Sequence, residues 1–505
     1  MMWRAAATAT LLASAPWMAH AAASPATATT TTATTTATTA IVTLDQTSLR
    51  AAPRDSAAQQ AVLWQGDALE VRGEKLGYLQ VYDHRRERTG YVLATQVRKS
   101  ALVASDAPGL LAVLGFVRDT PGMEALGIGY AAAYLKAAPA GSITAEPFDA
   151  LGSMAERLAR RASLRQGPGR AADAVAAHLE VAGVYGLQFK SHERDGAIRL
   201  CYEGDAFRRV FSLAATGEQR ARAALALTRH DCIDPATPAL ERAQFDQQRA
   251  EWLDHVEPAQ WAQLPDGWKN RVRQRRAGVW SAIAFTKARQ GESAASASAA
   301  RRALDELAAV NRLELSDDDF VDYTDAAVRV GAVRWAAEPV AAATGRERIR
   351  IVTTPGEPGE TCVALRASDP GSAPLAQRCT YGIVWAASAS PSADGRALAL
   401  AVQPLEGWRE LWVFRLQAGQ WTVDVLPPAA SHPELGYLEF AGWVPGGAKL
   451  LLAREARVDG RFKRSFEVAD TATLNTEKQA SVPTLLVLFG KWQDAAWKRA
   501  SVSLR

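Results

Sequence analysis

Apolar positions along this chain change their spacing twice, which divides it into three regions. Across residues 41–100, short runs in which apolar and polar positions alternate are separated by turn residues, a pattern typical of β-strands. Across 106–338, apolar residues recur every three or four positions and predict amphipathic helices. Across 341–505 the strand-like runs return. At roughly 150 residues per domain, a chain of 505 residues accommodates three such regions, so we predict a multidomain α+β protein.

The first region predicts a small β-barrel. It holds five short strand-like runs within about sixty residues, and turn residues such as Pro53 separate them. Four motifs follow one another: LRAAP at 49–53, GD at 66–67, EKLGYLQV at 74–81 and TGYV at 89–92. In order and spacing they resemble the bacterial SH3 (SH3b) domain over residues 43–98. The resemblance implies an SH3-like barrel, with tyrosine at 78 and 91 where that family more often has tryptophan.

One face of this barrel is a candidate ligand site. Tyr78, Gln80 and Tyr82 alternate with two aliphatic residues, so the two groups point to opposite faces of a strand. The resemblance implies binding of cell-wall peptides or protein segments, or a purely structural role. We therefore expect Tyr78, Gln80, Tyr82 and Tyr91 to form a face that binds a cell-wall peptide or an envelope protein. In the alternative interpretation these tyrosines only cover the barrel or pack on the helical region.

The second region predicts an all-α domain interrupted by one β-hairpin. Its start is marked by Asp106 before Pro108, a combination typical of a helix N-terminus. Short loops between successive amphipathic segments favour a bundle or an array of helix pairs. The hairpin is expected near 197–203. The expected helices span 106–117, 122–138, 146–164, 170–184, 217–230, 238–255, 268–289, 299–313 and 316–336.

The third region predicts an antiparallel β domain built from repeated hairpins. DGRALAL at 394–400 and GGAKLLL at 446–452 are turn-plus-strand units 52 residues apart, and Phe414 and Phe466 repeat at the same offset. With WVPGG at 443–447, these hairpins resemble blades of β-propellers of the TolB or WD40 type, which often carry a Trp-Ser-Pro-Asp-Gly turn. The region holds about three units, whereas a ring needs at least four blades. We therefore expect a multi-hairpin sheet or a sandwich.

The N-terminus has the pattern of a secretory signal peptide. Residues 1–23 combine Arg4, a short alanine-rich apolar run and Ala-x-Ala cleavage sequences. The alternative is a membrane anchor, but spanning needs about 20 apolar residues, and this run is short and interrupted by Pro16. Residues 24–40 are almost all alanine and threonine and predict a disordered leader. We expect export across the inner membrane to the periplasm, with no transmembrane segment in the mature chain.

Four cysteines remain, and an even number in an exported chain favours disulfides. Their spacing suggests two local bonds, Cys201 with Cys232 and Cys362 with Cys379, although sequence alone permits three connectivities. One alternative is a zinc site, although the spacing lacks a C-x-x-C pattern. Its ligands would be Cys201, Cys232, His192 and His230. The other alternative is a nucleophile at Cys232 with His230 as its base.

Charge and motifs argue against several classes of function. The 58 Lys and Arg against 54 Asp and Glu give a formal net charge of +4, too balanced to indicate a nucleic-acid surface. The sequence contains no G-x-S-x-G, no G-x-x-x-x-G-K-[ST] and no H-E-x-x-H motif. Its histidines are scattered over all three regions. We therefore predict no catalytic constellation, no metal, no cofactor and no nucleic-acid partner.

Two charged clusters lie on predicted helices. The acidic cluster could bind a divalent cation or favour a helix N-terminus capped by Ser316; it comprises Asp317, Asp318, Asp319, Asp322 and Asp325. The arginine cluster could hold an anion or form a solvated helix face, with Trp280 in the core; it comprises Arg271, Arg273, Arg275 and Arg276 beside Trp268. For both clusters we favour the structural interpretation.

Together these patterns predict an exported binding or scaffold protein of the cell envelope. The SH3b-like domain would recognise a cell-wall peptide or a protein segment, and the other two regions would present surfaces to envelope partners. One alternative is a peptidoglycan hydrolase whose site the sequence does not reveal. The other is a purely structural module.

Overall fold

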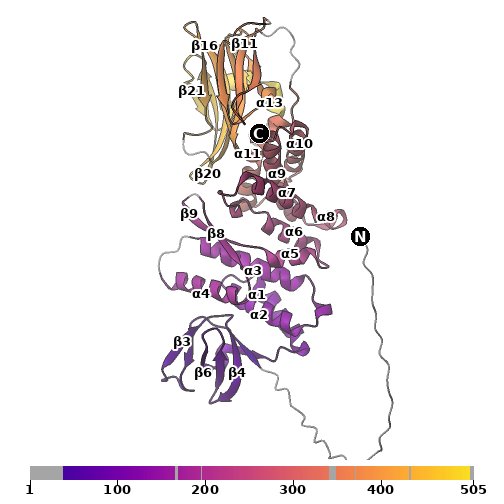
Figure 1. Ribbon diagram of the computed structural model, residues 1–505, viewed down its shortest axis with the longest axis vertical. Helices are drawn as coiled ribbons and strands as arrows, with labels where there is room; N and C mark the ends of the chain where they lie inside the picture. The colour runs from indigo at the N-terminus through magenta and orange to yellow at the C-terminus, as the bar shows by residue number, and fades with distance from the viewer. Residues whose placement is uncertain are drawn as a thin grey trace, which may run out of the picture. The chain divides into compact units, whose positions relative to one another are not determined.

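The structure is a computed structural model that describes residues 38–164, 169–194, 196–340, 348–369, 371–430 and 434–500 (Figure 1). The predicted signal peptide and residues 24–37 of the predicted leader lie outside the described residues. An N-terminal antiparallel sheet, a helical region and C-terminal β-sheets follow one another, so the α+β class is confirmed. In the described ranges, no helix combines the length and the apolar character needed to cross a bilayer.

The N-terminal sheet has seven antiparallel strands in the order β3-β2-β6-β5-β4-β1-β7. Alternation places Leu79 and Val81 in its core without exposed surface, as predicted, together with Leu49 and Val92. The strand order has two ends, so backbone pairing does not close this described sheet into the expected barrel. The strands are β1 (Thr39–Val42), β2 (Thr47–Arg50), β3 (Gln59–Leu63), β4 (Ala68–Lys75), β5 (Tyr78–Asp83), β6 (Arg88–Leu93) and β7 (Val97–Ser100).

One turn of this sheet is packed against the helical region. Gly66 has a φ of +88°, and a Cβ there would lie 2.3 Å from the backbone oxygen of Ala125, so only glycine fits. The Tyr185 hydroxyl donates to the Gly66 carbonyl at 2.7 Å. Nearby, Nε2 of the buried His178 lies 2.8 Å from Oδ1 of Asp45. This end of the sheet is therefore occupied by the protein's own helices.

The helical region contains the predicted β-hairpin and two short helices that the sequence pattern did not reveal, α5 and α8. Several ends are set by side chains: Thr216 and Gln219 form a capping box on α6, and Ser316 caps α11 as predicted. The elements are α1 (Ala107–Arg118), α2 (Glu124–Ala137), α3 (Glu146–Ser163), α4 (Arg170–Val184), β8 (Phe189–Arg194), β9 (Ala197–Tyr202), α5 (Asp205–Phe211), α6 (Gly217–Leu227), α7 (Ala239–Asp254), α8 (Pro258–Gln263), α9 (Asp266–Arg289), α10 (Ser293–Ala308) and α11 (Asp317–Val333).

Two C-terminal sheets follow. The first pairs β10 (Ile349–Pro355), β11 (Thr361–Ala367) and β12 (Ala376–Thr380). The second contains β13 (Ile383–Val384), β14 (Ser390–Pro391), β15 (Ala397–Leu405), β16 (Trp408–Gln417), β17 (Gln420–Leu426), β18 (Leu435–Trp443), β19 (Lys449–Val458), β20 (Arg461–Asp470) and β21 (Thr476–Ala480). Pairing is antiparallel except between β16 and β18, where Trp408 faces Gly436 in a short parallel contact. The helices α12 (Val487–Trp492) and α13 (Ala495–Ala500) follow.

The 52-residue sequence repeat corresponds to two equivalent hairpins, β15–β16 and β19–β20. Phe414 and Phe466 are fully buried in the second strand of each hairpin. The turns before the hairpins contact each other, because a Cβ on Gly447 would lie 2.6 Å from Oδ2 of Asp394. The repeat is therefore structural, while the relation to propeller blades stays a prediction.

A buried ion cluster joins the helical region to the second C-terminal sheet. Oε1 of Glu439 on β18 accepts hydrogen bonds from Arg334 and Arg409, each at 2.6 Å. Its Oε2 accepts from Trp497 Nε1 at 2.6 Å. Arg334 lies in the turn η6 (Arg334–Ala336), directly after α11. This cluster fixes the C-terminal end of α11 against β16 and β18.

Candidate functional site

The predicted binding residues lie on β5 and β6, and the strand register brings them together. Gln80 lies opposite Tyr91, and Tyr82 lies opposite Thr89 on the same face. Tyr78, two residues before Gln80, points to this face as well. The four candidates therefore share one side of the sheet, which we call the β5–β6 face.

The four residues differ in exposure, and Tyr78 departs from the expectation of an exposed aromatic. Gln80 is exposed and Tyr82 and Tyr91 are half-buried, whereas Tyr78 is only 6% exposed. The Tyr78 hydroxyl donates to the Asp55 carboxylate, and this hydrogen bond raises the pKa of the phenol. Tyr78 therefore holds the loop after β2, and the accessible part of the face is formed by Gln80, Tyr82 and Tyr91.

Charged groups of both signs surround Tyr82. The Arg72 guanidinium lies 4.4 Å from the centre of the ring, and His84 meets the ring edge-on at 4.7 Å. His84 Nε2 in turn lies 2.7 Å from Oε2 of Glu70. Hydrogen bonds from His84 and Arg72 lower the pKa of Glu70. The β5–β6 face thus offers an aromatic surface with a cation and an anion beside it.

Both predicted cysteine pairs are disulfides. The Cys201–Cys232 sulfurs are 2.06 Å apart and join β9 to the turn η4 (His230–Cys232), while the Cys362–Cys379 sulfurs are 1.92 Å apart and join β11 to β12. The zinc site and the Cys232 nucleophile are therefore wrong, because neither sulfur is a thiolate.

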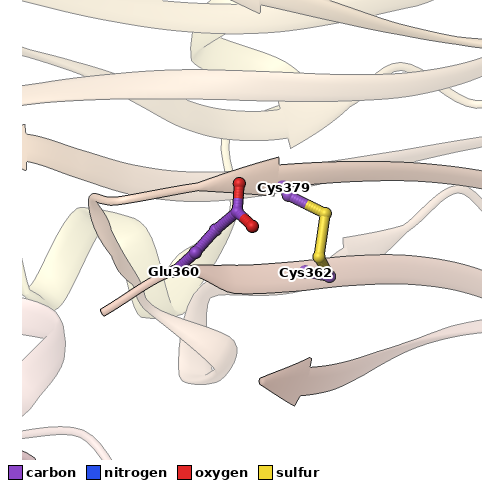
Figure 2. Close-up of side chains that lie close together, drawn as sticks. All are labelled: Glu360, Cys362 and Cys379. Atoms are coloured by element: carbon purple, nitrogen blue, oxygen red, sulfur yellow. A yellow bond between two sulfur atoms is a disulfide. The ribbon is translucent and has the colours of Figure 1, made fainter. Parts of the chain in front are cut away.

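A carboxylate lies beside the second disulfide. Figure 2 shows Glu360 with its carboxylate near Cys362 and Cys379, within a group that has metal-ligand composition. Both sulfurs are used in the disulfide, and a disulfide sulfur is not the thiolate that soft metals require. We therefore assign no metal site to this group.

The two charged clusters, which lie 41 or more positions apart in sequence, meet around one cavity of about 570 Å³. Trp268, Arg271 and Arg275 line it from α9. Four members of the acidic cluster line it from α11: Asp318, Asp319, Asp322 and Asp325. The helices α3 and α6, the β8–β9 hairpin, η4 and the region around the β19–β20 turn also line it.

Arg271 is exposed, as the solvated-face interpretation expects, whereas Arg273, Arg275 and Arg276 are half-buried. Arg273 donates to the Ala309 carbonyl at 2.6 Å, and Arg276 donates to the Leu253 carbonyl at 2.7 Å. The capping interpretation of the acidic cluster is confirmed at Asp319, whose backbone N–H donates to Ser316 Oγ at 3.2 Å.

Sequence reasoning missed other residues of this cavity, notably Gln274 and Arg199. A signal for the walls was present, because residues 268, 271 and 275 and residues 318, 322 and 325 each follow helical spacing along one face. What the sequence did not contain was the pairing of α9 with α11. Arg199 is the one charged residue of β9, and Gln274 is one of many polar residues in the first half of α9, so neither stood out in the sequence.

Comparison with known proteins gave no match to any family model, curated protein or solved structure.

Proposed function

We propose that this chain is an exported binding protein of the cell envelope whose SH3b-like domain holds a cell-wall peptide on the β5–β6 face. One observation carries the proposal: the register places exposed Gln80 opposite Tyr91 and beside Tyr82. Aromatic rings give a peptide large contact area at low conformational cost, and the Gln80 amide can both donate and accept hydrogen bonds.

The charges around Tyr82 favour a peptide that carries both signs. Arg72 and His84 both contact Glu70 at the surface, so a peptide carboxylate or amine would exchange with these exposed contacts. The rest of the N-terminal sheet is less suitable for binding a peptide. Its inner face is filled by apolar side chains and its Gly66 turn contacts α2 and Tyr185.

Export is supported by two features. The N-terminal sequence has the order of a signal peptide, and disulfides persist chiefly in oxidising compartments such as the periplasm. In this proposal the repeated C-terminal hairpins are propeller-blade-like modules that present surfaces to envelope partners.

The test is co-sedimentation of the mature, oxidised protein with purified peptidoglycan, with the supernatant analysed for released fragments. Retention in the pellet without fragment release is the expected result. Release of soluble muropeptides would replace the proposal with a hydrolase. A folded protein that stays in the supernatant would replace it with a structural module or a protein-binding domain.

A further inference from the structure

The cavity between α9, α11 and the β8–β9 hairpin is positively charged. Among the described residues, nine arginines line it against six carboxylates. The one histidine among its described lining residues, His230, is half-buried beside several arginines; desolvation and those charges hold its pKa well below the usual value, so it adds no charge at neutral pH. The cavity therefore favours an anionic occupant.

Most of these arginines already have a carboxylate partner. Arg271 donates to Asp319 at 2.7 Å and Arg329 to Asp325 at 2.6 Å. Arg229 binds Asp231 in the same way. Such pairs shape the wall and leave little charge for a ligand.

Arg275 and Arg199 have no carboxylate within 4.0 Å of their guanidinium groups among the described residues. Arg275 donates to the Leu225 carbonyl at 2.8 Å and to Thr228 Oγ1 at 3.4 Å, both neutral acceptors. The side chain of Arg199 on β9 has no hydrogen-bond or ion-pair partner in the part of the chain that the structure describes, and its Nε is buried. A guanidinium that is desolvated without a counter-charge is costly. An oxyanion that accepts from both would remove that cost.

Gln274 independently indicates that the cavity binds a ligand. It is only 3% exposed, lines the cavity, and neither its amide nitrogen nor its amide oxygen has a partner within the described chain. Buried polar groups are nearly always hydrogen-bonded, and each unpaired one costs free energy. One amide that lacks both a donor and an acceptor fits a ligand that supplies both, as a hydroxyl group does.

Asp322 further limits the chemistry of the ligand. It lines the same cavity, it is exposed to solvent, and its carboxylate has neither a hydrogen bond nor an ion pair among the described residues. A bare oxyanion would meet electrostatic repulsion from this carboxylate. A ligand that carries hydroxyl groups beside its anionic group would instead donate a hydrogen bond to it.

We infer that this cavity binds a small hydroxylated oxyanion, a sugar phosphate or a sugar carboxylate. Arg199 and Arg275 hold the anionic group, Gln274 pairs with a hydroxyl, and Asp322 accepts from another. The cavity volume of about 570 Å³ lies within the usual range of small-molecule sites, about 300–1,000 Å³. This site uses none of the residues of the β5–β6 face.

The first disulfide holds part of the wall in place. It anchors η4, whose His230 and Asp231 line the cavity. Arg194 of β8 donates to the His230 carbonyl at 2.6 Å, which joins the hairpin to the same turn. The site is therefore preorganised in the oxidised protein.

The test is isothermal titration of the mature, oxidised protein with four probes: glucose 6-phosphate, glucuronic acid, glucose and inorganic phosphate. We expect glucose 6-phosphate or glucuronic acid to bind about tenfold or more tightly than both glucose and phosphate. Only these two probes carry both an anionic group for the arginines and hydroxyl groups for Gln274 and Asp322. The tighter-binding probe shows whether the site prefers a phosphate or a carboxylate. Binding of neither, or equal binding of inorganic phosphate, overturns the inference.

Variants locate the site. Arg199→Gln should weaken binding of the better probe about tenfold by removing a charge-assisted hydrogen bond, and it should leave the fold intact because Arg199 has no partner to lose within the described chain. Arg301→Gln is the matched control, because Arg301 is an exposed arginine of α10 that does not line the cavity. Equal affinities of the Arg199→Gln variant and the wild type would contradict the assignment. Peptidoglycan retention should be unchanged in both variants.

Discussion

Arg275 of α9 and Asp322 of α11 line the same cavity and influence each other's charge, yet they form no ion pair. Burial lowers the pKa of Arg275 and raises the pKa of Asp322, so each is less stable in its charged form than it would be in water. A ligand anion beside Arg275 and a ligand hydroxyl beside Asp322 would each stabilise the charged form and return the pKa towards its usual value. This pair, together with Gln274, distinguishes the cavity from the satisfied ion pairs elsewhere in the wall.

Replacing Gln274 with methionine should stabilise the protein. Methionine keeps the volume and removes two buried polar atoms that have no partner in the described ranges, which is worth about 1 kcal/mol. The control is Asn270→Leu on the same helix. Asn270 is equally buried, but its amide donates to the Asn311 carbonyl at 3.0 Å and accepts from the Asn311 N–H at 2.9 Å.

Urea unfolding of the ligand-free protein measures both changes. We expect a higher free energy of unfolding for Gln274→Met and a loss of about 2 kcal/mol for Asn270→Leu. Similar losses for the two variants would mean that the Gln274 amide already has hydrogen-bond partners in the ligand-free protein. Gln274 would then give no support to a ligand in the cavity.

The two disulfides should affect stability alike and ligand binding differently. They close loops of 31 and 17 residues, so replacing either pair with serines should cost about 3 kcal/mol in the free energy of unfolding. The Cys201→Ser, Cys232→Ser variant should also weaken binding of the better of the two sugar anions, glucose 6-phosphate or glucuronic acid, because η4 carries part of the cavity wall. The Cys362→Ser, Cys379→Ser variant is the control, and a matching loss of affinity there would show that the effect is global.

Glu439 should make stability depend on pH in the acid range. Burial alone would raise its pKa, but Arg334 and Arg409 outweigh burial and lower it from 4.5 to about 2. A depressed acid pKa stabilises the folded state above the unfolded value, and this contribution is lost as pH falls from about 4.5 towards 2.

The corresponding variant is Glu439→Gln, which leaves Arg334 and Arg409 buried without their counter-charge. We expect a loss of about 3–5 kcal/mol at pH 7 and a smaller difference from the wild type at pH 3. Urea unfolding at both pH values measures this. A difference that is the same at the two pH values would contradict the role assigned to the carboxylate.

Features set by short-range pattern were predictable from the sequence. Alternation of apolar and polar residues placed Leu79 and Val81 in the core. The even number of cysteines and their grouping into two local pairs indicated both disulfides, and the 52-residue offset indicated two equivalent hairpins. Each of these depends on residues close in sequence or on a repeat within it.

Features set by tertiary packing were not predictable. The burial of Tyr78 depends on Asp55, 23 residues away, and the parallel contact of β16 with β18 depends on how two hairpins meet. The cavity depends on α9 and α11 facing each other, so the sequence revealed both charged clusters without showing that they form two walls of one site.

Cell-wall binding by the β5–β6 face is tested most directly by peptidoglycan co-sedimentation of the Gln80→Ala, Tyr82→Ala double variant beside Tyr381→Ala. Tyr381 is a 58% exposed tyrosine outside the N-terminal sheet and serves as the matched control. We predict that the double variant stays in the supernatant with an unchanged unfolding transition, while the wild type and Tyr381→Ala are retained in the pellet. Equal retention of all three proteins would contradict the claim.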